Sequence, residues 1–261
     1  MKTSPLSKLI EQVKPRRFHC YCVGAAKTGT TSLASSFSKS YRAGHEPETR
    51  DTNRFIIDYL EKKIGRKDVQ RKLLKRDRRL RLELESAHPL GYLPGVLVDT
   101  FPRARFIVTV REPLSWLRSR LNYHHKKQPL LWAEYRDYFW SRRHERFAPE
   151  EAPLQHYNLW SLDTYLSQYA DHYQRVLSEI PEDRRMVVLT SEIVGKLPAI
   201  ASFVGANPEK VEPSHTNRSD DKITPLHDMD DAFINKKILE HCGELILNYF
   251  PDRMDFYTAT S

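Results

Sequence analysis

The sequence predicts an α/β protein in which a parallel β-sheet carries helices on both faces and forms a single domain. Short apolar runs typical of buried strands alternate along the chain with segments of helical spacing. No internal repeat or long low-complexity linker interrupts this alternation. The length of 261 residues suffices for a full core and favours one domain over two. We therefore predict an N-terminal extension at residues 1–17 and one domain at residues 18–261.

The first strand, turn and helix lie in the stretch "FHCYCVGAAKTGTTSLASSF". Residues 18–23 are rich in β-favouring side chains, and the apolar positions after Ser32 have helical spacing. A turn at the N-terminus of a helix presents unpaired N–H groups and the positive end of the helix dipole. Gly24 and Gly29 allow a ligand to approach the backbone closely. This unit predicts a site for a phosphate-like anion and a P-loop-like sheet.

The order of residues in this turn differs from that of the common nucleotide loop. That loop reads G-x-x-x-x-G-K-S/T, with the lysine after the second glycine. Here Lys27 precedes Gly29 and two threonines follow it. The displacement argues against an ordinary ATP or GTP loop. A tight turn without a ligand is the simpler alternative, but it seldom needs a lysine and three threonines together.

The other predicted elements continue the alternation. A short extended piece at Tyr41–His45 is followed by helical segments from about Arg50 to Arg76. Strand-like stretches follow at Leu80–Leu84, Arg105–Val110 and Met186–Leu189. In open parallel sheets, ligands bind beyond the carboxyl ends of the strands. The motifs that follow these strands are therefore expected to share one edge of the sheet.

The stretch "ARFIVTVREPLSWLRSRLNYH" carries a second set of anion ligands. Arg111 stands at the end of a buried strand, and Pro113 is well placed to open a helix. Ser115 and Ser119 are one helical turn apart, which leaves Ser119 free to point where Arg111 points. An arginine fork and a serine hydroxyl at one place are good phosphate ligands. Alone, the stretch would favour a surface arginine before an amphipathic helix.

Together the two stretches resemble the bacterial, small-molecule or natural-product type of sulfotransferase, which depends on 3′-phosphoadenosine-5′-phosphosulfate (PAPS). The loop of that family reads G-x-x-K-S/T-G-T-T, and its second motif reads R-x-P with a serine eight residues after the arginine. The likeness continues through "FPRARFIV", through "YNLWSLDTYLSQYADHYQRVLSEIPEDRRMVVLTSEI" and through "IASFVGA". It covers residues 18–251. The resemblance implies transfer of a sulfuryl group to a hydroxyl or amine of a small molecule.

The resemblance also implies a donor site, with adenosine 3′,5′-bisphosphate (PAP) as product and no metal required. Lys27 would donate to the bridging oxygen of the phosphosulfate, and Arg111 and Ser119 would bind the 3′-phosphate. A closing segment, "PSHTNRSDDKITP", would add Arg218 and Lys222, although the R-K-G pattern usual in cytosolic members is absent. The expected phosphosulfate-binding residues of the loop are Gly24, Ala26, Lys27, Thr28, Gly29, Thr30, Thr31 and Ser32.

Two places compete for the base that removes the acceptor proton. Glu46 and Glu48 follow a short strand, where several bacterial sulfotransferases carry a glutamate base. His88 follows the next strand, near the position of the catalytic histidine of cytosolic members, but Glu85 replaces their preceding lysine. We favour Glu46 as the base, and Glu48 and His88 are the alternative candidates.

The acceptor pocket is expected among aromatic residues at helical spacing. Trp132, Tyr135 and Phe139 recur in "LLWAEYRDYFWSRRHERF", where family members often line the acceptor pocket. Such a stripe more often belongs to a core. The acceptor itself, its site of modification and the oligomeric state are not predicted.

The net charge of +8 suits a polyanionic ligand. The run from Lys62 to Arg81 could attract an acidic glycan, a nucleic acid or a membrane surface. Val69, Leu73 and Leu74 give it a partial apolar face, which favours a solvated amphipathic helix, and aromatic side chains for base stacking are not interleaved. We expect neither a nucleic acid nor a membrane as partner. Two alternative functions stay open, a P-loop small-molecule kinase and a non-catalytic polyanion-binding protein.

The sequence predicts a cytoplasmic protein. No apolar run reaches the length that a bilayer requires, and Met1 to Pro15 lacks the apolar core of a signal peptide. Three cysteines, Cys20, Cys22 and Cys242, are too few and too unevenly placed for a disulfide framework. Cys20 and Cys22 alternate on one face of the first strand, where burial is expected.

Overall fold

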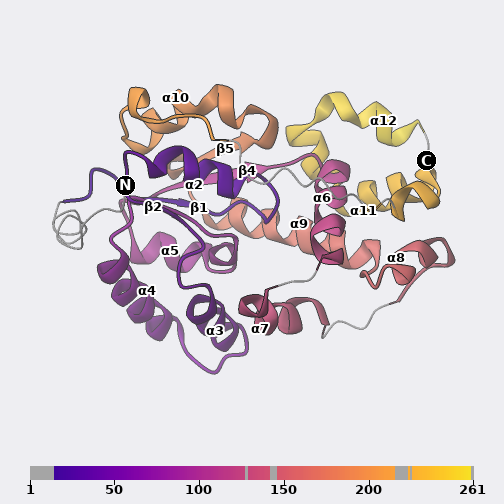
Figure 1. The fold of residues 1–261 in the computed structure, drawn as a ribbon, viewed down its shortest axis with the longest axis horizontal. Helices are drawn as coiled ribbons and strands as arrows, with labels where there is room; N and C mark the ends of the chain where they lie inside the picture. Colours follow the sequence, from indigo (N-terminus) through magenta and orange to yellow (C-terminus); the bar gives the residue numbers. More distant parts are fainter. Residues whose placement is uncertain (1–14, 127–128, 142–145, 215–222, 224, 260–261) are drawn as a thin grey trace.

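A computed structural model describes residues 15–126, 129–141, 146–214, 223 and 225–259. In this part of the chain, five strands form one wholly parallel sheet in the order β2-β3-β1-β4-β5. Helices flank the sheet on both faces, so the predicted α/β class is confirmed (Figure 1). The strands are β1 (Cys20–Cys22), β2 (Ala43–His45), β3 (Leu84–Ser86), β4 (Arg105–Val110) and β5 (Arg185–Leu189).

The register of the strands aligns their carboxyl ends. Cys22, the last residue of β1, pairs with Ser86, the last residue of β3. Ser86 pairs in turn with His45, the last residue of β2. The segments that follow these three strands therefore leave the sheet side by side. This alignment brings the turn after β1, the turn after β2 and the segment after β3 to one place.

Side chains that alternate along the strands build a separate core on each face. Cys20 and Cys22 are buried on the face covered by α2 (Thr30–Ser38) and α10 (Ile193–Val204), as their alternation predicted. Tyr21 and Val23 point to the opposite face, into the larger core. Figure 1 shows α2 and α10 on one side of the sheet and α5 and α9 on the other. The helices packed around the larger core include α3 (Thr49–Leu60), α4 (Arg66–Leu80), α5 (Pro94–Thr100) and α9 (Leu162–Glu179).

The helix after β4 begins as its sequence predicted. Pro113 is the first residue of α6 (Pro113–His125), and the Glu112 carboxylate caps it by accepting from the N–H groups of Leu114 and Ser115. This cap fixes the direction in which α6 leaves the sheet edge. The remaining helices are α7 (Ala133–Arg136), α8 (Ala152–His156), α11 (Asp231–Tyr249) and α12 (Met254–Thr258).

The helical segments predicted over about 50–76 are α3 and α4. Gly65 is the N-cap of α4, and the Asp68 carboxylate accepts from the Gly65 N–H at 3.1 Å. The strand predicted at Leu80–Leu84 is wrong by several residues. Leu80 ends α4, Arg81 adopts a left-handed conformation with φ 48°, and β3 begins only at Leu84.

The basic run forms an amphipathic helix whose charges are partly paired. Val69 and Leu73 are buried in α4, but Leu74 is exposed, so the predicted apolar face is narrower than expected. Arg76 is buried against Glu85, with two contacts of 2.6 Å, and also donates to the carbonyl of Pro47 at 2.8 Å. Arg76 thereby ties α4 to β3 and to the turn after β2.

None of the described helices is long and apolar enough to cross a membrane. The cytoplasmic location and the domain boundary before Phe18 stay predictions.

Candidate active site

The turn after β1 needs both of its glycines. A Cβ atom at Gly24 would lie 1.9 Å from the Thr109 hydroxyl of the neighbouring strand. Gly29 has φ 89° and opens α2, and a Cβ there would lie 2.5 Å from the Ile193 side chain. Lys27 also adopts a left-handed conformation, with φ 71°. The tight turn thus lies close against β4 and ends at the N-terminus of α2.

The buried side chain of Thr28 stabilises this turn through hydrogen bonds. Its buried hydroxyl donates to the Ala25 carbonyl at 2.6 Å and bonds the Thr109 hydroxyl at 2.7 Å. The Thr190 hydroxyl donates to the Thr28 carbonyl at 2.9 Å. Thr28 would therefore bind a ligand through its backbone N–H, whereas Thr30 and Thr31 line a cavity directly.

Arg111 lies beside the turn, at the end of β4. Its Nη1 donates to the carbonyl of Lys27 at 3.2 Å, and its Nε donates to the Ser115 hydroxyl at 3.0 Å. The serine bonded to Arg111 is thus Ser115. Ser119 follows one helical turn later and is half-buried, and its role as a ligand stays a prediction.

Lys27 stands in a cationic environment. Burial lowers the pKa of Lys27, and the charges of Arg120, Arg111 and Lys126 lower it further. These cations repel one another, so an anionic ligand that bound among them would relieve the repulsion.

Glu46 and His88 meet across the aligned strand ends. His88 Nδ1 lies 2.5 Å from Glu46 Oε1, a distance at which the ring N–H donates to the carboxylate. Glu46 has φ 49°, and the Thr49 hydroxyl donates to its carbonyl at 2.6 Å. The two side chains were predicted as competing bases, and in the structure they form one hydrogen-bonded pair.

The surroundings of Glu46 keep its carboxylate ionised. Burial alone would raise the pKa of Glu46, but the charge and hydrogen bond of His88 outweigh it, with smaller contributions from His45 and Arg120. The pKa of Glu46 is therefore lowered from its ordinary value of 4.5. Oε1 is occupied by His88, and Oε2 lies 3.8 Å from His45 Nδ1.

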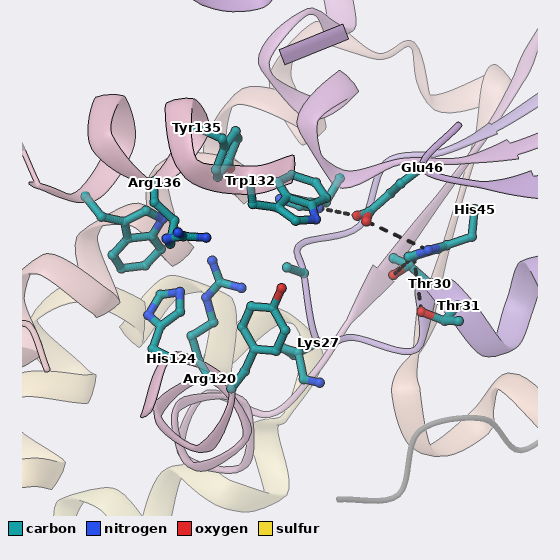
Figure 2. Close-up of a pocket in the computed structure, with 14 residues that line it drawn as sticks. Lys27, Thr30, Thr31, His45, Glu46, Arg120, His124, Trp132, Tyr135 and Arg136 are labelled. Atoms are coloured by element: carbon teal, nitrogen blue, oxygen red, sulfur yellow. Dashed lines mark hydrogen bonds and ion pairs between the residues drawn. The ribbon is translucent and has the colours of Figure 1, made fainter. Parts of the chain in front are cut away.

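His45 links the carboxylate to the turn after β1, a role that the sequence analysis missed. Its Nε2 lies 3.3 Å from the hydroxyl of Thr30 and 3.1 Å from that of Thr31 (Figure 2). The signal was available, because His45 immediately precedes Glu46 at a predicted strand end. Burial lowers the pKa of His45, partly offset by Glu46.

Glu48 pairs with an arginine outside the cavity, unlike Glu46. It precedes α3 and accepts two hydrogen bonds from Arg79, at 2.7 and 2.6 Å. It does not line the cavity. The structure thus separates the two glutamates that the sequence grouped together.

A cavity of about 160 Å³ joins these parts. Trp132 and Tyr135 line it, and His88 stacks on Trp132 with ring centroids 5.2 Å apart. That this cavity receives the acceptor stays a prediction. Phe139 instead stacks behind the wall on Tyr92, with centroids 4.2 Å apart. The polar lining beside the strand ends is Lys27, Thr30, Thr31, His45, Glu46 and His88, and the sequence analysis missed the lining residues Arg120, Tyr123, His124, Arg136 and Trp140.

Two of the predicted donor ligands, Arg218 and Lys222, lie outside the described residues. Among the residues that the structure describes, no group of three or more histidine, cysteine or acidic side chains could hold a metal ion.

The chain was compared with family models, solved structures and curated proteins. A family model described as a sulfotransferase domain matches residues 20–221. The fold is also similar to a sulfotransferase from Alicyclobacillus acidocaldarius, with 18% identity over 88% of this chain and 95% of that one and a TM-score of 0.47. The sulfotransferase domain from the curacin biosynthetic pathway has 12% identity over 80% of this chain and 81% of that one, with a TM-score of 0.36. A search of curated proteins found no match.

Proposed function

Because this chain belongs to the family of sulfotransferase domains, we propose that it moves a sulfuryl group from PAPS to a hydroxyl or amine of a small-molecule acceptor. One observation carries the proposal. The turn bearing Lys27, the arginine after β4 and the Glu46–His88 pair all lie at the same edge of the sheet. Lys27, Glu46 and His88, which would serve as leaving-group cation, base and positioning residue, line one cavity, and Arg111 contacts the turn beside it.

The turn after β1 would bind the 5′-phosphosulfate. Its backbone N–H groups and the N-terminus of α2 favour an anion, and Thr30 and Thr31 add hydroxyl donors. Arg111, which contacts the Lys27 carbonyl, would bind the 3′-phosphate together with Ser119. This second phosphate is the feature that separates PAPS from ATP. Adenosine 3′,5′-bisphosphate would leave as the product.

Charge develops on the leaving phosphate during transfer. The acceptor oxygen or nitrogen forms a bond to sulfur while the bond from sulfur to the bridging oxygen breaks. The electron pair of the broken bond stays on the 5′-phosphate. The Lys27 ammonium, fixed beside the turn, would stabilise this charge by donating to the bridging oxygen.

Glu46 would take the acceptor proton. Its carboxylate is ionised, and His88 occupies only Oε1, which leaves Oε2 for the acceptor. His88 would act as a positioning residue, because its Nδ1–H orients the carboxylate while Trp132 and Tyr135 pack against its ring. His88 Nε2 is buried and has no hydrogen-bond partner in the described part of the chain.

The first test of this function is transfer of labelled sulfur. PAPS labelled in its sulfuryl group would be incubated with the enzyme and a mixture of phenols, alcohols and amines, with and without a metal chelator. We expect label in an acceptor product, one PAP released for each label transferred, and no effect of the chelator. Phosphoryl transfer from ATP in the same mixture, with no sulfur transfer, would instead support a small-molecule kinase.

A further inference from the structure

One end of the cavity holds a buried arginine without an anionic partner. Arg120 on α6 is only 5% exposed, and its guanidinium carbon lies 5.4 Å from the ring centroid of Tyr123 and 4.9 Å from that of Trp140. Its Nε has no hydrogen-bond partner, and no carboxylate pairs with it among the residues that the structure describes. Burying a cation without an anion costs free energy. A ligand that brought an anion to this place would offset the cost.

A second arginine faces the same end. Arg136 is half-buried in α7 and lines the cavity, with Nη1 donating to the Pro129 carbonyl at 3.2 Å. His124 lies beside the two arginines (Figure 2) and adds no charge at neutral pH. Burial lowers the pKa of His124 well below 6.5, and the charges of Arg120 and Arg136 lower it further. Its Nδ1 is hydrogen-bonded to the Tyr165 hydroxyl at 3.0 Å.

The two ends of the cavity have opposite character. Figure 2 shows Arg120, Arg136 and His124 gathered on one side, with Glu46 and His45 on the other. Trp132 and Tyr135 lie along the wall between these groups. A molecule that spanned the cavity would therefore meet cations at one end, aromatic rings in the middle and a carboxylate base at the other end.

We propose that the acceptor is a hydroxylated aromatic acid whose carboxylate binds Arg120 and Arg136 while its hydroxyl faces Glu46. This inference rests on the proposed sulfuryl transfer and names the class of its acceptor. A planar carboxylate matches the fork of a guanidinium group. A flat ring suits a wall of aromatic side chains. The separation of charge along the cavity also orients the acceptor, because its carboxylate is repelled from Glu46.

The competing role for Arg120 is contact with the donor. Lys27, Arg111 and the turn after β1 already provide donor ligands, but Arg120 contributes to lowering the pKa of Lys27 and is therefore near enough to act on the donor as well. The two roles differ in one measurable respect. A donor ligand affects every acceptor equally, whereas an acceptor ligand discriminates between an acid and its neutral ester.

Binding of para-hydroxyphenylpropionate and of its methyl ester to the PAP-loaded enzyme tests the proposal. Trp132 and Trp140 line the cavity, so their fluorescence reports occupancy. For the wild type, we expect the acid to bind at least ~10-fold more tightly than the ester, the scale of one charged hydrogen bond. Arg120→Gln and Arg136→Gln should each reduce this ratio, and Arg120→Lys should restore part of it. Arg118→Gln is the matched control, because Arg118 is exposed on the same helix.

Three results would overturn the proposal. They are equal binding of acid and ester to the wild type, absence of acid binding, and equal weakening of acid and ester in both glutamine variants. PAP binding and sulfation of the ester are measured on the same samples. Sulfation of an ester that binds as well as the acid would refute only the acceptor class, whereas absence of both PAP binding and sulfur transfer would refute the proposed function itself.

Discussion

Replacing Lys27 with alanine is expected to lower kcat by at least ~100-fold, the loss seen when one preorganised donor to a developing charge is removed. The ammonium stands beside the turn that would hold the phosphosulfate, and no other lysine lines the cavity among the described residues. Alanine adds no backbone strain of its own, because lysine already has a Cβ at the same φ of 71°. The measurement is single-turnover release of PAP at saturating donor.

Lys39→Ala serves as the control for this variant. Lys39 is exposed beyond α2 and pairs with Glu212 at the surface, so its loss should leave kcat unchanged. Lys27→Arg should recover part of the rate, since it keeps the charge. A Lys27→Ala enzyme with near wild-type turnover and the same melting temperature would contradict the role given to Lys27.

Glu46→Gln is expected to lower kcat by about 10²- to 10⁴-fold, the range associated with loss of a general base. Glutamine keeps the shape and can still accept from His88, but it cannot take the acceptor proton. Glu48→Gln provides a neighbouring control, since Glu48 is paired with Arg79 outside the cavity. Full activity of Glu46→Gln, or a comparable loss in Glu48→Gln, would contradict the assignment.

The pH dependence separates the base from its positioning partner. If Glu46 is the base, activity requires its ionised form. Because the pKa of Glu46 is lowered, the acid limb of kcat/KM should lie below pH 4.5. In His88→Ala the lowering contributions of His88 are lost while burial still raises the pKa of Glu46, so this limb should move to higher pH. His88→Asn should move it back in part, because the amide N–H can replace Nδ1–H. If His88 were itself the base, its loss would abolish turnover and leave no acid limb to observe.

The parts of the site that depend on local chain order could be predicted from the sequence. The turn with Lys27 and the strand at Arg105–Val110 are marked by short-range patterns of glycine, lysine and buried apolar residues. The third strand was misplaced because Leu80, Leu82 and Leu84 alternate with charged residues, which resembles a strand. Leu80 belongs to α4, and only the left-handed Arg81 ends that helix.

The end of the cavity that carries Arg120 and Arg136 could not be predicted in the same way. Arg120 and Arg136 are 16 residues apart, and their meeting depends on how α6 and α7 pack, which no local pattern encodes. The pairing of Glu46 with His88 likewise depends on the register of β2 and β3. Sequence reasoning identified both side chains but treated them as alternatives, since it had no register from which to infer contact.

Calorimetric titration with PAP beside ADP and ATP, with and without Mg²⁺, tests the central claim most directly. It would compare the wild type with Arg111→Ala, since Arg111 lies beside the turn and would bind the 3′-phosphate. We expect tight, metal-independent binding of PAP, much weaker binding of ADP, and loss of the preference for PAP in the variant. Preferential binding of ATP with Mg²⁺, unchanged in Arg111→Ala, would contradict the donor assignment and make the kinase the leading function.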